Sequence, residues 1–268
     1  MGDERKKSAV MAWRFIFEAE RGGGRLFAVI DAKKLLLDSK RPLPAHTVKS
    51  LRDHLLIEWT YHTNAIEGNT LTLVETKVVL EGITVGGKTL REHLEVINHR
   101  EAIVYIEEIV SKNEPLSEWK IRNIHRLVLS KIDDANAGVY RKENVRIAGA
   151  KHIPPTCYEL AGEMQRLMEW YEGEGRLLHP VARAAHLHIK FVGIHPFVDG
   201  NGRTSRLLLN FELMKHGYPP VVIRKESRLT YYDALDKAHT TGIDSDFIAL
   251  VAAELNNELD TYLQLVPL

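Results

Sequence analysis

Apolar side chains recur at steps of three and four residues along most of the chain, which is the spacing of one buried face of an α-helix. One such stripe lies between residues 44 and 68 and consists of Val48, Leu51, Leu55 and Trp59. Further stripes with the same period follow from about residue 90 to the C-terminal end. We therefore predict a mainly α-helical bundle.

Capping residues mark where several of these helices should begin and end. The start signals are Thr89 with Glu92, Ser117, Thr156 with Glu159, and Pro180. Each Thr–Glu pair has the spacing of a capping box, in which the hydroxyl and the carboxylate both accept backbone N–H groups. Gly217 is expected to end the helix that precedes it, because glycine takes the left-handed conformation at low cost.

Strand signals are few. Val145, Ile147 and Ile153 alternate with polar residues, which predicts a short exposed β-hairpin over residues 144–154, the segment called the flap below. A second short hairpin is expected over residues 83–90, where two glycines follow each other. The expected fold is thus helical with a small β-hairpin flap.

Charge and cysteine content narrow the class of protein. Lys and Arg total 36, as do Asp and Glu, so the formal net charge is zero. Nucleic-acid-binding proteins usually carry a basic excess, so we expect no nucleic-acid partner. Cys157 is the single cysteine, which excludes an intramolecular disulfide and favours a reducing compartment. With no recognisable signal peptide or membrane span, we expect a cytoplasmic protein without membrane contact.

Candidate chemistry is concentrated in one segment, residues 195–206, between two predicted helices. The tripeptide at 200–202 has two glycines, so its backbone N–H groups can form an anion-binding nest. A helix that starts directly afterwards adds its positive N-terminal end. Arg203 and Arg206 fall on one face of its first turn and would complete a polyphosphate site.

Two further residues of this segment have the chemistry that transfer at phosphorus requires. Asp199 precedes the nest, and a carboxylate beside a triphosphate is the usual ligand of Mg²⁺. His195 lies four residues earlier, and its near-neutral pKa suits a general base for an attacking hydroxyl. A glycine-rich turn with a solvated charge pair is the alternative, but the combination of these residue types favours a phosphoryl-transfer site.

The sequence HPFVDGNGRTSR at 195–206 matches the Fic family motif, HPFx(D/E)GNGRxxR, at every specified position. The chain therefore resembles Fic proteins, which are helical and mostly transfer AMP from ATP to Ser, Thr or Tyr hydroxyls of target proteins. The resemblance implies a role for each motif residue: His195 as the base, Asp199 as the Mg²⁺ ligand, Gly200, Asn201 and Gly202 as backbone phosphate contacts, Arg203 at the inner phosphates and Arg206 at the γ-phosphate.

The resemblance extends from about residue 50 onward. It implies that Val145, Ile147 and Ile153 in the flap dock a target segment as an added strand. It also implies two parts packed as one unit, an N-terminal helical segment (1–68) and a catalytic core (69–268).

The sequence TNAIEG at 63–68 resembles the inhibitory motif (S/T)xxxE(G/N) of regulated Fic proteins, with Thr63, Glu67 and Gly68 at the specified positions. A glutamate near a helix C-terminus is disfavoured by the helix dipole unless a cation pairs with it. If Glu67 pairs with Arg206, the arginine cannot hold the γ-phosphate. We therefore expect an autoinhibited enzyme that also modifies itself.

Several alternatives stay open. The enzyme could mainly remove AMP or move another phosphate-linked group, or the chain could be a non-catalytic module that senses nucleotide. A homodimer is also compatible with the exposed faces of its amphipathic helices. The segment 82–89 fits the P-loop pattern GxxxxGK(S/T), but the residues before it predict a short helix instead of the required buried strand.

Overall fold

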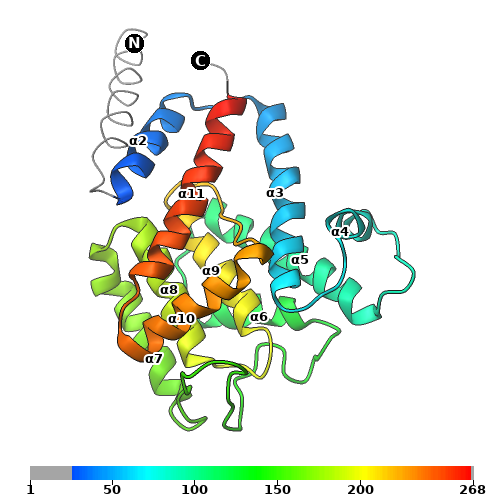
Figure 1. The fold of residues 1–268 in the computed structure, drawn as a ribbon, viewed down its shortest axis with the longest axis vertical. Coiled ribbons are helices and arrows are strands. Elements are labelled where there is room, and N and C mark those ends of the chain that lie inside the picture. The colour runs from blue at the N-terminus through cyan, green and yellow to red at the C-terminus, as the bar shows by residue number, and fades with distance from the viewer. Residues whose placement is uncertain (1–25, 267–268) are drawn as a thin grey trace.

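The computed structural model describes residues 26–266, which form ten α-helices and two short 3-10 helices (Figure 1). The α-helices are α2 (Leu26–Ser39), α3 (Ala45–Ile66), α4 (Leu73–Leu80), α5 (Leu90–Ser111), α6 (Glu118–Leu129), α7 (Leu160–Glu172), α8 (Pro180–Ile194), α9 (Asn201–Lys215), α10 (Arg228–Thr241) and α11 (Ser245–Leu265). The 3-10 helices are η1 (Glu174–Leu177) and η2 (Lys225–Ser227). The mainly α-helical fold is confirmed. The first 25 residues of the predicted N-terminal segment lie outside the described residues.

Helix α9 is the centre of the bundle. It contacts α3, α5, α6 and α8, and most of its side chains are buried, polar ones included. One apolar cluster on it includes side chains of α3, α5, α6, α7 and α8, and a second includes side chains of α2, α3, α8, α10 and α11. Helix α11 runs beside α2 in Figure 1. The N-terminal end of α9 is therefore held rigidly by packing on several sides.

The predicted helix starts agree with the structure, and three of the four start signals act as predicted. Thr89 and Glu92 form a complete capping box, Ser117 accepts the N–H of Lys120, and Pro180 opens α8. The helix predicted to follow Thr156 and Glu159 begins at Leu160, as α7 does; Glu159 accepts the N–H of Thr156, but Thr156 does not cap the helix. Gly217, with φ of 75°, follows the end of α9 as expected.

Two expectations about local structure were wrong. Neither residues 83–90 nor the flap contains a β-strand, and the described residues as a whole form none. The physical reason is that side chains take the N–H groups that a hairpin would use: Asp236 accepts those of Lys151 and His152, and His93 accepts that of Val85. The apolar stripe predicted on α3 is buried only from Leu51 onward; its first member, Val48, is exposed.

No helix among residues 26–266 is long and apolar enough to cross a membrane.

Candidate functional site

The loop between α8 and α9 is fixed by its own backbone and by one side chain. His195 ends α8 in the left-handed conformation with φ of 50°, which is uncommon for a residue other than glycine. Gly200 has φ of 76° directly before α9. The amide of Asn201 donates to the carbonyl of Phe197 at 2.8 Å and accepts the Phe197 N–H at 3.0 Å. Asn201 is thus a structural clamp of the loop through its side chain.

A histidine from α6 binds the backbone of the loop and stacks on one of its side chains. His125 accepts the N–H of Gly138 on Nδ1 at 2.9 Å, so its Nε2 carries the proton and donates to the carbonyl of Asp199 at 2.8 Å. Its ring stacks on Phe197 with centroids 3.5 Å apart. Burial lowers the pKa of His125 to about 4, so the ring is neutral and keeps this tautomer.

Arg206 is almost completely buried, and each nitrogen of its guanidinium donates a hydrogen bond. Nε donates to Thr63 Oγ1 at 2.5 Å, Nη1 to the Tyr231 hydroxyl at 3.2 Å, and Nη2 to Glu67 Oε1 at 2.6 Å. Burial opposes the charge, but Tyr231 and Glu67 outweigh it and raise the pKa of Arg206. The guanidinium therefore stays charged and is held by the end of α3.

Glu67 also lies against the first turn of α9. A Cβ atom on Gly202 would be 2.3 Å from Glu67 Oε1, a distance that real Cβ contacts do not show. Glu67 is the C-cap of α3, and its side chain is 30 % exposed. The carboxylate thus occupies the space beside the predicted phosphate nest.

His195 lies at a cavity of about 500 Å³. The same cavity is lined by Glu67, Gly202, flap residues 147–150 and one face of α10. His195 Nδ1 is buried, and a hydrogen bond to the backbone of Val192 favours the protonated ring. Burial lowers the pKa of His195 to about 4, so the imidazole is neutral at pH 7 and can accept a proton.

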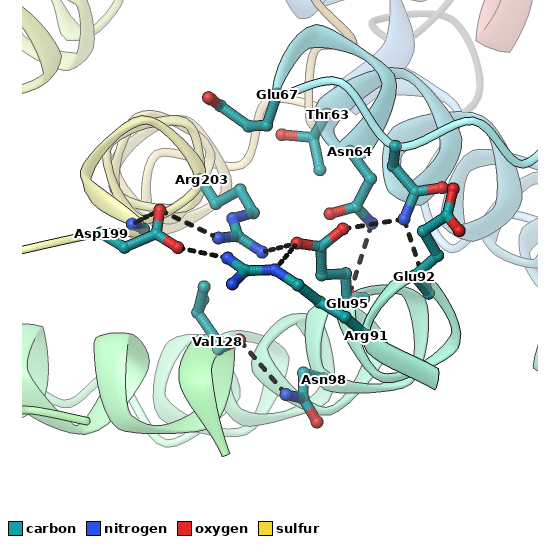
Figure 2. A network of polar contacts seen from close by, with 12 residues as sticks. Thr63, Asn64, Glu67, Arg91, Glu92, Glu95, Asn98, Val128, Asp199 and Arg203 are labelled. Carbon is teal, nitrogen blue, oxygen red and sulfur yellow. Dashed lines mark hydrogen bonds and ion pairs between the residues drawn. The ribbon is translucent and has the colours of Figure 1, made fainter. Parts of the chain in front are cut away.

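Asp199 belongs to a network of charges on the other side of the loop (Figure 2). Oδ1 accepts the Gly200 N–H at 2.6 Å and lies 3.4 Å from Nη2 of the buried Arg203, while Oδ2 lies 2.5 Å from Nη2 of Arg91. Burial opposes its ionisation, but Arg203, the N–H and Arg91 outweigh this and lower the pKa of Asp199. Mg²⁺ is often bound by few protein ligands, with phosphate oxygens and waters completing its coordination. A half-exposed, ionised carboxylate beside a phosphate nest fits such a site.

Comparison with known proteins identifies the fold. The Fic/DOC family model matches residues 115–213. A solved fragment of Fic-1 from C. elegans, residues 134 to 508, is 33 % identical with a TM-score of 0.78 and covers 89 % of this chain and 73 % of that one. A Fic-domain-containing signaling protein from Bacteroides thetaiotaomicron is 30 % identical with a TM-score of 0.79, covering 90 % and 96 %. The chain belongs to the Fic/DOC family.

Curated Fic relatives are longer than this chain. Protein adenylyltransferase Fic from Culex quinquefasciatus is 40 % identical over 240 residues, which are 88 % of this chain and 47 % of that protein. The same-named protein of Drosophila willistoni is 38 % identical over 241 residues, 89 % and 48 %. The chain thus spans about half the length of the curated relatives it matches.

The structure brings most of the predicted Fic site residues together. His195, Gly202 and Glu67 share the cavity, Thr63 and Glu67 hold Arg206, and Gly68 with φ of 99° ends the turn after α3. The flap residues separate: Ile147 lines the cavity, Val145 is half-buried outside its lining, and Ile153 is exposed.

Three residues that the sequence did not reveal shape this Fic site. His125 supports the loop, Asp236 anchors the flap through two backbone N–H groups at 2.8 and 2.9 Å, and Arg91 pairs with Asp199. Each lies far from the motif in sequence and meets it only through tertiary packing.

Proposed function

We propose that this Fic-family chain transfers AMP from ATP to a Ser, Thr or Tyr hydroxyl of a target protein and of itself. The observation that carries the proposal is the position of His195. Its neutral imidazole lines a cavity that also reaches the glycine nest at the N-terminal end of α9. A base next to a phosphate cradle is the arrangement that hydroxyl attack at phosphorus requires.

In this reaction the target oxygen loses its proton to His195 and forms a bond to the α-phosphorus, while the bond to pyrophosphate breaks. The N–H groups of Asn201 and Gly202 and the guanidinium of Arg203 would stabilise the phosphate charge, whereas the Gly200 N–H, also expected to bind phosphate, donates to Asp199 Oδ1. Mg²⁺, when bound, would be held by Asp199 and would reduce that charge further. Flap residues 147–150 line the same cavity and would border the target segment there.

We also propose that Glu67 holds the enzyme inactive. Its carboxylate lies 2.6 Å from Arg206 Nη2, so the guanidinium is already neutralised by a protein carboxylate. A γ-phosphate that arrives there must displace Glu67 and also meets its negative charge. The inhibitory segment 63–68 would thus act within the same chain as the 69–268 core.

Removal of AMP is the second candidate activity. It is favoured by the fact that Glu67 lines the same cavity as His195, where a carboxylate can orient a water molecule for attack on a phosphodiester. Incubation of AMP-modified chain with Mg²⁺ alone tests it. Loss of the modification in the wild type but not in Glu67→Gly supports this activity.

A cytoplasmic site of action is also proposed. ATP is available in the cytoplasm, and the reducing conditions of that compartment suit the free Cys157. Mg²⁺ and a target protein with an exposed hydroxyl are the partners that the activity needs.

Intact-mass spectrometry of the full chain after incubation with ATP and Mg²⁺ tests the main proposal. Glu67→Gly should gain the mass of AMP well beyond the wild type, and Glu67→Gly with His195→Ala should gain none. Glu81→Gly is the matched control, because Glu81 caps α4 and is exposed away from the loop. If Glu67→Gly is labelled no more than the wild type, inhibition by Glu67 is wrong. If labelling survives His195→Ala, the role of the base is wrong.

A further inference from the structure

Arg91 is a cation from the first turn of α5 that reaches the carboxylate proposed to bind metal. Its Nη2 lies 2.5 Å from Asp199 Oδ2, and its Nε donates to Glu95 Oε1 at 3.1 Å. Figure 2 shows the guanidinium between these two carboxylates, with Arg203 beside it. The motif contains neither Arg91 nor Glu95.

The two oxygens of Asp199 have different surroundings. Oδ1 is turned into the loop, where it accepts the Gly200 N–H and faces Arg203. Oδ2 is the oxygen that is left to face a ligand, and Arg91 covers it. A divalent cation needs direct access to a carboxylate oxygen, and a guanidinium beside that oxygen also repels it.

We propose that Arg91 competes with the divalent cation for Asp199 Oδ2 and thereby sets the metal concentration at which the nucleotide complex forms. The inference rests on the proposed function, because it takes Asp199 as the metal ligand. When the cation binds, Arg91 moves away from Oδ2. Arg91 would therefore set how tightly the site binds a divalent cation.

Arg91 can make this movement at low cost. Its side chain is 56 % exposed, so the released guanidinium enters solvent. Its contact through Nε to Glu95 can be kept while Nη2 rotates away. Glu95 also accepts a hydrogen bond from the Asn69 amide at 2.9 Å and pairs with Arg203, so Glu95 keeps these contacts when Arg91 moves.

The same contacts make Arg91 a suitable residue to replace. Arg91→Gln removes the charge, while Asp199 retains Arg203 and the Gly200 N–H. Arg91→Lys keeps the charge but not the fork that joins both carboxylates. Arg100→Gln is the control, because Arg100 lies on the same helix and pairs with Glu101 away from the loop.

Electron paramagnetic resonance of Mn²⁺ measures the competition directly. Mn²⁺ is titrated into the full chain with saturating α,β-methylene-ATP, which cannot transfer AMP. All variants carry Glu67→Gly so that the nucleotide can bind productively. An exposed ion pair of this kind corresponds to about five-fold in affinity, so Arg91→Gln should bind Mn²⁺ on the order of five-fold more tightly. Arg91→Lys should restore most of the weaker affinity, and Arg100→Gln should match the parent.

Two results would overturn the inference while leaving the proposed function in place. In the first, Arg91→Gln and the parent bind Mn²⁺ equally. In the second, Arg91→Gln weakens nucleotide binding both with Mn²⁺ and with EDTA, which makes Arg91 a phosphate contact. Failure of the proposed function has a different signature: neither parent nor variant shows Mn²⁺ binding that depends on the nucleotide, and the inference then falls with it.

Discussion

Replacement of Glu67 by glutamine should lower stability and raise nucleotide affinity at the same time. The variant keeps the shape of the side chain but removes the charge that faces Arg206 at 2.6 Å. The guanidinium is 3 % exposed and retains Thr63 and Tyr231 as partners. A hydrogen bond between charged groups contributes about 1.5–3 kcal/mol. Because Glu67 is itself 30 % exposed, water can reach the site, and we expect the lower end, about 1.5 kcal/mol.

Thermal unfolding with and without ligand separates the two effects. A loss of about 1.5 kcal/mol lowers the Tm of a protein of this size by roughly 3–6 °C. Saturating ATP with Mg²⁺ should then raise the Tm of Glu67→Gln more than that of the wild type, because a tighter ligand stabilises more at equal concentration. Glu81→Gln serves as the control and should change neither value. An unchanged Tm, or a lowered Tm with no greater response to ATP, would refute the reasoning.

Three further predictions concern the supports of the site. The unfolding free energy, measured by urea titration, should fall by roughly 2 kcal/mol between pH 7 and pH 5 for each of His125 and His195. The pKa of each histidine is about 4 in the folded state and about 6.5 in the unfolded state. This stability is therefore full above pH 6.5 and is lost as the pH falls toward 4. His125→Gln should remove its share of that pH dependence, and an unchanged slope would contradict the assigned burial. Asp236→Ala should free two flap N–H groups, so hydrogen exchange at residues 151 and 152 should quicken at least ten-fold; protection equal to the wild type would show another anchor. Gly200→Ala should destabilise by about 1–2 kcal/mol in the same urea assay, since φ of 76° and a Cβ 3.2 Å from His125 Nε2 both disfavour a side chain; no loss would mean that the loop can rearrange.

The helical fold and the catalytic loop could be predicted because their signals are local. Apolar periodicity and capping residues depend on neighbours within a few positions, and the structure confirms the helical bundle and the predicted helix starts. The 195–206 segment is contiguous, so its glycines, carboxylate and arginines could be read together. Pairing of Glu67 with Arg206 was expected from a second local motif, and the structure places these side chains in contact. Its inhibitory role stays a prediction.

The remaining features depend on contacts between distant segments. The alternation of Val145 and Ile147 predicted a hairpin, but the flap N–H groups are bound by Asp236 on α10, which no local pattern reveals. The role of Asn201 is similar: the sequence predicted only a backbone phosphate contact, whereas its side chain also binds the backbone of Phe197. No local pattern marks Arg91, which meets Asp199 only through the packing of the chain.

Absence of a side chain at position 202 has a consequence for how this protein changes state. Glu67 Oε1 fills the volume next to the α9 amides that any larger residue would need, so this corner accommodates a single negatively charged group. If phosphate binds at this nest as proposed, it would compete with the chain's own carboxylate for the same corner. Under the proposed inhibition, activation would be an exchange of one anion for another at a helix end.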